Sequence, residues 1–135
     1  MTSFYNKLNF KTCINKYRIK KEEERRMSTV YVIQDFGTWN LTPALEFGNI
    51  KVLLPARRQI IFSSAPTVNR LRQELREITD DDYLLLSGDP AAIGVASAIV
   101  SDYLNGKLNL LKWDKQERMY YPININLKNY GDIDE

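Results

Sequence analysis

The chain has 135 residues, of which 44% are hydrophobic and 27% charged, and its formal net charge is +2. This composition is typical of one ordinary globular domain with room for a hydrophobic core, and no apolar run is long enough to span a bilayer. A single cysteine, Cys13, excludes an intramolecular disulfide and a cysteine-based metal site. Because the first residues also lack a secretory signal, we expect a cytoplasmic protein.

Residues 1–27 form a basic arm ahead of the predicted domain. Residues 1–26 hold eight Lys and Arg against three Glu, a net charge of +5, whereas residues 27–135 hold eleven against fourteen acidic residues, a net charge of −3. Such an arm can bind nucleic-acid phosphates. The mixed charge run over residues 20–26 is also typical of a solvated extension that is poorly ordered or partly helical. The sequence leaves both interpretations open.

The first half of the domain, which we place at residues 28–128, contains three predicted strands followed by a helix. Runs rich in β-branched and aromatic residues predict the strands Thr29–Gln34, Ile50–Leu54 and Gln59–Ser63. The helix begins near Pro66, because apolar residues then recur at three- and four-residue spacing. These apolar residues are Val68, Leu71, Leu75 and Ile78.

The second half alternates strands with a second helix. Tyr83–Ser87 is a short apolar strand, and Asp89 with Pro90 opens a helix rich in small residues that reaches Leu104 and is stopped by Asn105 and Gly106. Two strands follow, Leu108–Trp113 and Arg118–Leu127. Alternation in the last strand predicts one apolar face, formed by Met119, Tyr121, Ile123, Ile125 and Leu127. Pro122 indicates an edge strand, and we expect Trp113 and Tyr121 in the core.

This order of elements predicts an α/β fold. Two consecutive β-α-β units, from Gln59 to Trp113, require parallel strands, and the ends of the chain are expected to add antiparallel ones. The result is a mixed sheet of five to six strands with two main helices, preceded by the basic arm. Residues 129–135 form a polar tail.

The turn at residues 87–94 is a candidate ligand site, because ligands of open α/β sheets bind beyond the carboxyl ends of the strands and a helix N-terminus there attracts anions. The residues concerned are Ser87, Gly88, Asp89 and Gly94. Against this, Asp89 followed by Pro90 is an ordinary helix start, and its carboxylate would repel a phosphate. The turn also contains neither glycine-rich phosphate-binding motif.

The sequence offers few candidate catalytic residues. The chain contains no histidine, the commonest general base, so we expect no catalytic residue, metal or cofactor and a protein that is not an enzyme. The run Asp80–Asp82 reads as a solvated loop, since consecutive residues point to different sides.

Surface residues are the remaining candidates for a partner or nucleic-acid contact. They are Arg57, Arg58, Arg70, Arg72, Arg76 and Trp39. Lys112, Lys115 and Arg118 are the other basic residues of the domain that could contribute to such a surface. Interleaved Glu74 and Glu77 favour instead an exposed helix face with internal ion pairs.

Two stretches, Asp81–Gly94 and Leu110–Ile123, resemble small uncharacterised proteins of tailed bacteriophages, with a likeness that would cover Val30–Leu127. The resemblance implies a phage-encoded protein in a bacterial cytoplasm and brings no activity. We therefore expect an interaction or accessory protein that binds a host or phage macromolecule. The alternative is a nucleotide- or phosphate-binding domain that uses the turn at residues 87–94. Self-association is also left open.

Overall fold

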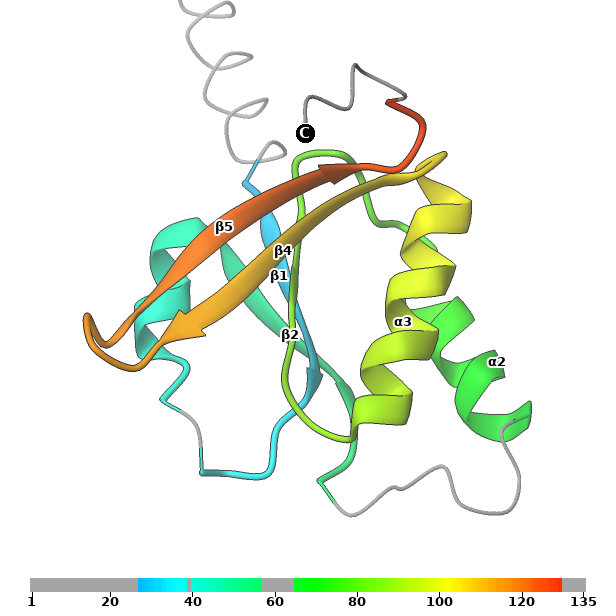
Figure 1. The fold of residues 1–135 in the computed structure, drawn as a ribbon. Helices are drawn as coiled ribbons and strands as arrows, with labels where there is room; N and C mark the ends of the chain where they lie inside the picture. Colours follow the sequence, from blue (N-terminus) through cyan, green and yellow to red (C-terminus); the bar gives the residue numbers. More distant parts are fainter. Residues whose placement is uncertain (1–26, 39, 57–64, 130–135) are drawn as a thin grey trace, which may run out of the picture.

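The computed structural model describes residues 27–38, 40–56 and 65–129. Their elements are β1 (Thr29–Gln34), the 3-10 helix η1 (Thr42–Phe47), β2 (Asn49–Leu54), α2 (Ala65–Glu74), β3 (Tyr83–Leu85), α3 (Pro90–Tyr103), β4 (Lys107–Asp114) and β5 (Met119–Asn126) (Figure 1). This confirms the α/β fold with two main helices. The predicted strand Gln59–Ser63 and the basic arm lie outside the described residues.

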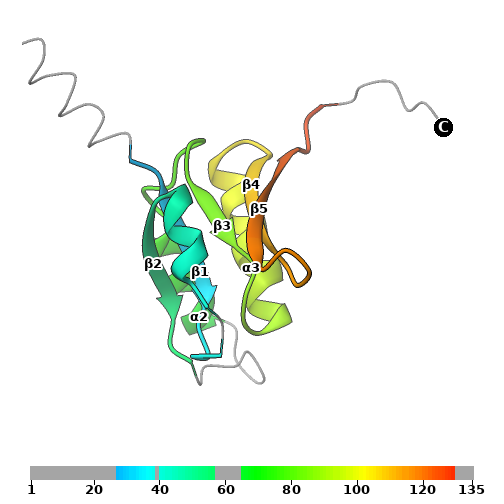
Figure 2. The same ribbon diagram turned by 90° about the vertical axis from the view of Figure 1, so that its left-hand side faces the viewer.

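The five strands form one mixed sheet in the order β2-β1-β3-β4-β5 (Figure 2). The first four strands are parallel and β5 is antiparallel to β4. The expectation of antiparallel strands at both ends of the chain is therefore wrong for β1, which runs parallel to both its neighbours. The connection between β1 and β2 contains η1 and reaches the length of about a dozen residues that a parallel crossover needs.

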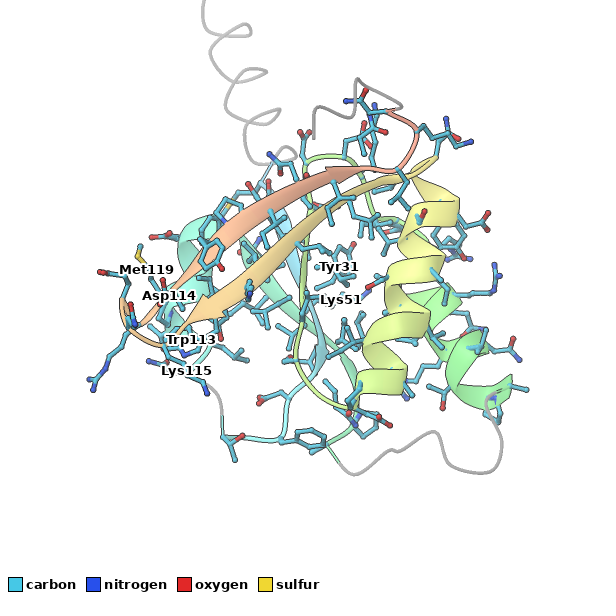
Figure 3. The ribbon with its side chains drawn as sticks, in the orientation of Figure 1. Tyr31, Lys51, Trp113, Asp114, Lys115 and Met119 are labelled. Carbon is cyan, nitrogen blue, oxygen red and sulfur yellow. The ribbon has the colours of Figure 1, made fainter. Side chains whose placement is uncertain are left out.

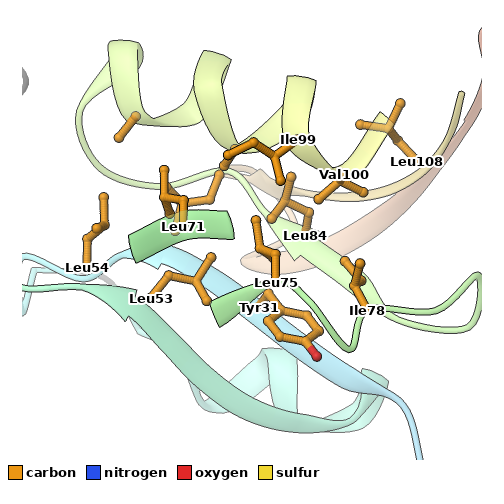
Figure 4. Close-up of a cluster of buried hydrophobic side chains, with 13 residues drawn as sticks. Tyr31, Leu53, Leu54, Leu71, Leu75, Ile78, Leu84, Ile99, Val100 and Leu108 are labelled. Carbon is orange, nitrogen blue, oxygen red and sulfur yellow. The ribbon is translucent and has the colours of Figure 1, made fainter. Parts of the chain in front are cut away.

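Each face of the sheet carries its own hydrophobic cluster. On one face α2 and α3 pack against the strands, with Leu71 and Leu75 close to Leu84 and Tyr31 (Figure 4). On the other face η1 covers a smaller cluster, which consists of Val30, Val32, Ala44, Leu85, Leu111 and Tyr120. Because both faces are covered there, every residue of β1 after Thr29 is buried.

Local sequence signals set the ends of α3. The carboxylate of Asp89 accepts a hydrogen bond from the Ala91 N–H at 3.0 Å, and Pro90 follows as the first helical residue. At the other end Asn105 and Gly106 adopt positive φ angles, and the Gly106 N–H donates to the Ser101 carbonyl at 2.8 Å. Both predicted signals are therefore confirmed. By contrast α2 ends earlier than expected, at Glu74, and its last predicted apolar residues lie in the turn that follows.

The β4–β5 hairpin buries a different tyrosine from the expected one. Tyr120 is 1% exposed and donates its O–H to the Asn40 carbonyl at 3.1 Å. Its ring packs at a tilt against that of Trp113, with the ring centroids 4.8 Å apart. Tyr121 is 38% exposed, so its expected core role is wrong, whereas Trp113 does pack against the core. The apolar side of β5 is left partly open, with Met119 and Leu127 also exposed.

β5 is an edge strand, as Pro122 indicates. The Leu127 N–H donates to the Gly106 carbonyl across the hairpin, at 2.8 Å. Because N–H directions alternate along an antiparallel strand, position 122 faces the open edge. The proline therefore costs the sheet no ladder hydrogen bond.

The two neighbouring tyrosines allow a direct test of this packing. Tyr120→Ala should lower the free energy of unfolding by about 3–5 kcal/mol, since it removes a fully buried ring. Tyr121→Ala should lower it by about 1 kcal/mol or less. Urea denaturation followed by circular dichroism measures both, and equal losses would contradict the assignment.

Candidate functional site

At the carboxyl end of the parallel strands, the candidate ligand turn is tied to β1 by Gln34. This side chain is fully buried; its Nε2 donates to the Pro55 carbonyl at 2.7 Å and its Oε1 accepts from the Asp89 N–H at 2.9 Å. The Ser87 hydroxyl donates to the Gln34 carbonyl at 2.8 Å. The Ser87 hydroxyl and the Asp89 N–H are thus both bound to Gln34.

Gly88 fits this turn because it lacks a side chain. Its φ is +105°, and a Cβ placed there would lie 2.3 Å from the Cβ of Gln34. Gly94 differs: it lies on an exposed part of α3, and a Cβ would meet nothing within 4 Å. The structure therefore brings Ser87, Gly88 and Asp89 together, while Gly94 lies apart from them. An anion site at this turn stays a prediction.

The two glycines form a matched pair of variants. Gly88→Ala should destabilise the protein by more than about 2 kcal/mol, because it combines a disfavoured backbone conformation with a clash against Gln34. Gly94→Ala should stabilise it by about 0.5–1 kcal/mol, since alanine suits a helix interior better. Thermal unfolding of both proteins tests this, and a tolerated Gly88→Ala would contradict the packing of the turn.

Of the arginines in the predicted partner surface, Arg70, Arg72 and Arg76 lie among the described residues, and all three are exposed. Arg70 donates its Nε to the Leu53 carbonyl of β2 at 3.0 Å. Arg72 points to α3 instead, where its guanidinium lies 3.9 Å from the carboxylate of Asp102. Arg76 is exposed in the turn after α2. Arg57, Arg58 and Trp39 lie outside the described residues, so their role stays a prediction.

At the opposite end of the sheet, where the parallel strands begin, Asp82 is a structural residue. It is only 9% exposed and its carboxylate accepts from the N–H groups of Thr29 and Thr79, each at 2.8 Å. The expectation that Asp80–Asp82 is a solvated loop is therefore wrong for Asp82, although Asp80 and Asp81 are exposed. The sequence could not predict this contact, because Asp82 and Thr29 are 53 residues apart in the chain.

The same end of the sheet carries a polar hollow of about 710 Å³, which we call the amino-end hollow. Its lining residues are Ser28, Asp80, Asp81, Tyr83, Asn109 and Asn124. Asn109 and Asn124 are cross-strand partners on β4 and β5, so the register of the hairpin brings them together. The side-chain amide of Asn109 donates to the carbonyls of Asp80 and Asp82, and the Tyr83 ring packs edge-on against Phe47. Sequence reasoning missed this site.

A smaller hollow of about 290 Å³ lies beside it. Its lining residues are Met27, Thr29, Tyr31, Glu77, Thr79, Asp81 and Asp82. Asp81 lines both hollows, so this end of the sheet is acidic on both sides of the point where the chain enters β1. Burial, and then the negative charges of Asp82 and Glu77, raise the pKa of Tyr31.

The raised pKa of Tyr31 gives a testable dependence on pH. The unfolded chain releases this proton near pH 10, before the folded protein does, so the contribution of Tyr31 to stability is present below about pH 10 and lost as pH rises through its higher pKa. Tyr31→Phe should therefore flatten part of the fall in melting temperature above pH 10. The exposed change Tyr121→Phe is the control, and equal slopes in Tyr31→Phe and wild type would contradict the shift.

A third surface lies at the tip of the β4–β5 hairpin. Met119 and Tyr121 are 45% and 38% exposed there. The register places both on the face of the sheet that carries α3, and Met119 lies at the end of the hairpin away from that helix (Figure 3). Three exposed basic residues surround them, namely Lys112, Lys115 and Arg118. We call these five residues the hairpin-tip surface.

The described residues contain no cluster of three or more His, Cys, Asp or Glu side chains arranged to hold a metal ion. Among these same residues, neither helix combines the length and the apolar character that a membrane crossing requires.

The fold defines a small α/β protein with a five-stranded mixed sheet and both α-helices on one face. The chain belongs to the Phage Pam3 gp32-like protein family, whose model matches residues 28–127. It is thus a small phage protein, which confirms the resemblance drawn from the sequence. Neither the curated proteins nor the solved structures contain a match.

Proposed function

We propose that this phage protein is a non-enzymatic accessory protein that binds a partner protein of the phage or its host through the hairpin-tip surface. The observation that carries the proposal is the exposure of Met119 and Tyr121 among three basic side chains. Tyrosine, methionine and arginine are enriched in the contact regions of protein interfaces. The lack of histidine in the chain supports a role other than catalysis.

The rear of the hairpin supports a preorganised binding surface. On the opposite side of the sheet from Tyr121, the Trp113 and Tyr120 rings pack against each other at a tilt, and Tyr120 is hydrogen-bonded to Asn40. The carboxylate of Asp114 accepts the backbone N–H groups of Gln116 and Glu117 and so orders the turn. A surface held in this way loses little conformational entropy when it binds.

The mixed charge of the hairpin tip favours a protein partner over nucleic acid. Asp114 and Glu117 belong to the same hairpin as the basic residues and add two negative charges to it. Phosphate backbones are bound by Lys and Arg, and these carboxylates would repel them. Nucleic-acid binding through the basic arm is a separate prediction. It would not use the hairpin tip.

Affinity capture with a matched control tests the proposal. The full chain, the double variant Met119→Ala/Tyr121→Ala and the control Val52→Ala are each used as bait in extracts of phage-infected cells. Val52 is 43% exposed on β2, which lies at the opposite edge of the sheet from β5. We expect wild type and control to retain a shared partner and the double variant to lose it at least about tenfold, the effect of one to two interface residues of more than 1 kcal/mol.

Two outcomes would contradict this function. One is an unchanged set of partners with the double variant, provided that its circular dichroism spectrum and melting temperature match those of wild type. The other is a rise in the melting temperature of wild type with millimolar nucleotide or phosphate, abolished by altering Ser87. That result would favour the ligand site at residues 87–94 instead.

A further inference from the structure

The sheet face that carries η1 is only partly covered. η1 packs against β1, β2 and the start of β5. Toward the end where the parallel strands begin, the same face opens into the amino-end hollow, with Asn124 exposed and Tyr83 and Asn109 half-buried. In α/β folds this face of the sheet is normally packed against another segment. The hollow is therefore a sheet face that lacks a covering element among the described residues.

The charge of this region selects a basic occupant. Asp80, Asp81 and Glu77 are exposed along the two neighbouring hollows, and buried Asp82 adds a further negative charge. Lys107 lies 3.6 Å from Asp80 and is the one described basic residue that pairs with these carboxylates. The region keeps a net negative charge, and the raised pKa of Tyr31 reflects part of it.

A basic segment of the same chain enters at this place. Met27 lines the smaller hollow, Ser28 lines the larger one, and Asp81 lines both. Residues 1–26, with a net charge of +5, precede Met27 directly, and Arg25 and Arg26 are its nearest neighbours in the sequence. At up to about 3.6 Å of chain per residue, the acidic rim is within reach of these two arginines.

We propose that residues 1–26 dock on the amino-end hollow of their own chain. The basic residues next to Met27 pair with Asp80 and Asp81, and the aromatic residues earlier in the arm cover Tyr83 and the two asparagines. The arm is long enough: as a helix, 26 residues would extend about 39 Å, whereas the eight-residue strands of the hairpin span about 27 Å. A nucleic acid would be repelled from the hollow and would have to compete for the arm.

The single cysteine of the chain makes the arm directly observable. A nitroxide spin label is attached to Cys13 of the full chain, and the backbone amide signals are recorded by NMR with the label oxidised and reduced. We expect the amides of Tyr83, Asn109 and Asn124 to lose at least half of their intensity. The amides of Ser87 and Gly94, at the opposite end of the sheet, should keep theirs.

Charge variants decide whether the acidic rim holds the arm. Asp80→Asn/Asp81→Asn, or 0.5 M salt, should restore at least half of the lost intensity. Asp82 is left intact because it binds Thr29 and Thr79. The control Asp102→Asn/Glu117→Gln removes two exposed carboxylates that do not line the hollow and should change nothing.

A second variant tests the pairing itself. Arg25→Glu/Arg26→Glu should abolish the broadening, and combining it with Asp80→Lys/Asp81→Lys should bring it back. Broadening confined to the residues next to Met27, or unaffected by the charge variants, would overturn the proposal. Broadening in a mixture of isotope-labelled chain and separately spin-labelled chain would assign the arm to a second copy and would overturn docking within one chain. The proposal is independent of the hairpin-tip function.

Discussion

The buried amide of Gln34 is the interaction on which the carboxyl end of the sheet depends. β1 lies between β2 and β3, and Gln34 is its last residue. Its side chain joins the end of β2 at Pro55 to the start of α3 at Asp89, and its backbone carbonyl receives the Ser87 hydroxyl. A buried amide without partners would cost several kcal/mol, so the three segments are held in one arrangement.

The opposite end of β1 is fastened in a similar way but remains open to solvent. There the Asp82 carboxylate accepts a hydrogen bond from the Thr29 N–H, so the segment before β3 holds the start of β1. At the other end of β1, Ser87 in the segment after β3 binds the Gln34 carbonyl. The two ends differ in what surrounds the bond. Gly88 closes tightly on Gln34 at the carboxyl end, whereas hollows flank Asp82 at the amino end. At the end of the sheet where α/β proteins usually bind ligands, the Gln34 side chain therefore occupies the space beside Gly88.

Features of the fold that depend on a few neighbouring residues could be predicted from the sequence. Features that depend on contacts between distant segments could not. Asp89, Pro90, Asn105 and Gly106 act on their own helix, so α3 could be placed from the sequence. The direction of β1 relative to β2 depends on the long crossover that contains η1. No local sequence pattern predicts the path of that connection. The burial of Tyr120 in place of Tyr121 depends on η1 and Asn40, which lie on the face of the sheet that Tyr120 occupies. The amino-end hollow could not be predicted because it needs the register that pairs Asn109 with Asn124.

Pro122 has a consequence for how this protein behaves at high concentration. The open edge of β5 presents backbone groups from alternate residues, and at position 122 the donor is missing in the middle of the row. A strand from another molecule could therefore not form an uninterrupted ladder along this edge. The proline therefore opposes edge-to-edge aggregation through β5, and it leaves the side-chain surface of the hairpin available for specific contacts.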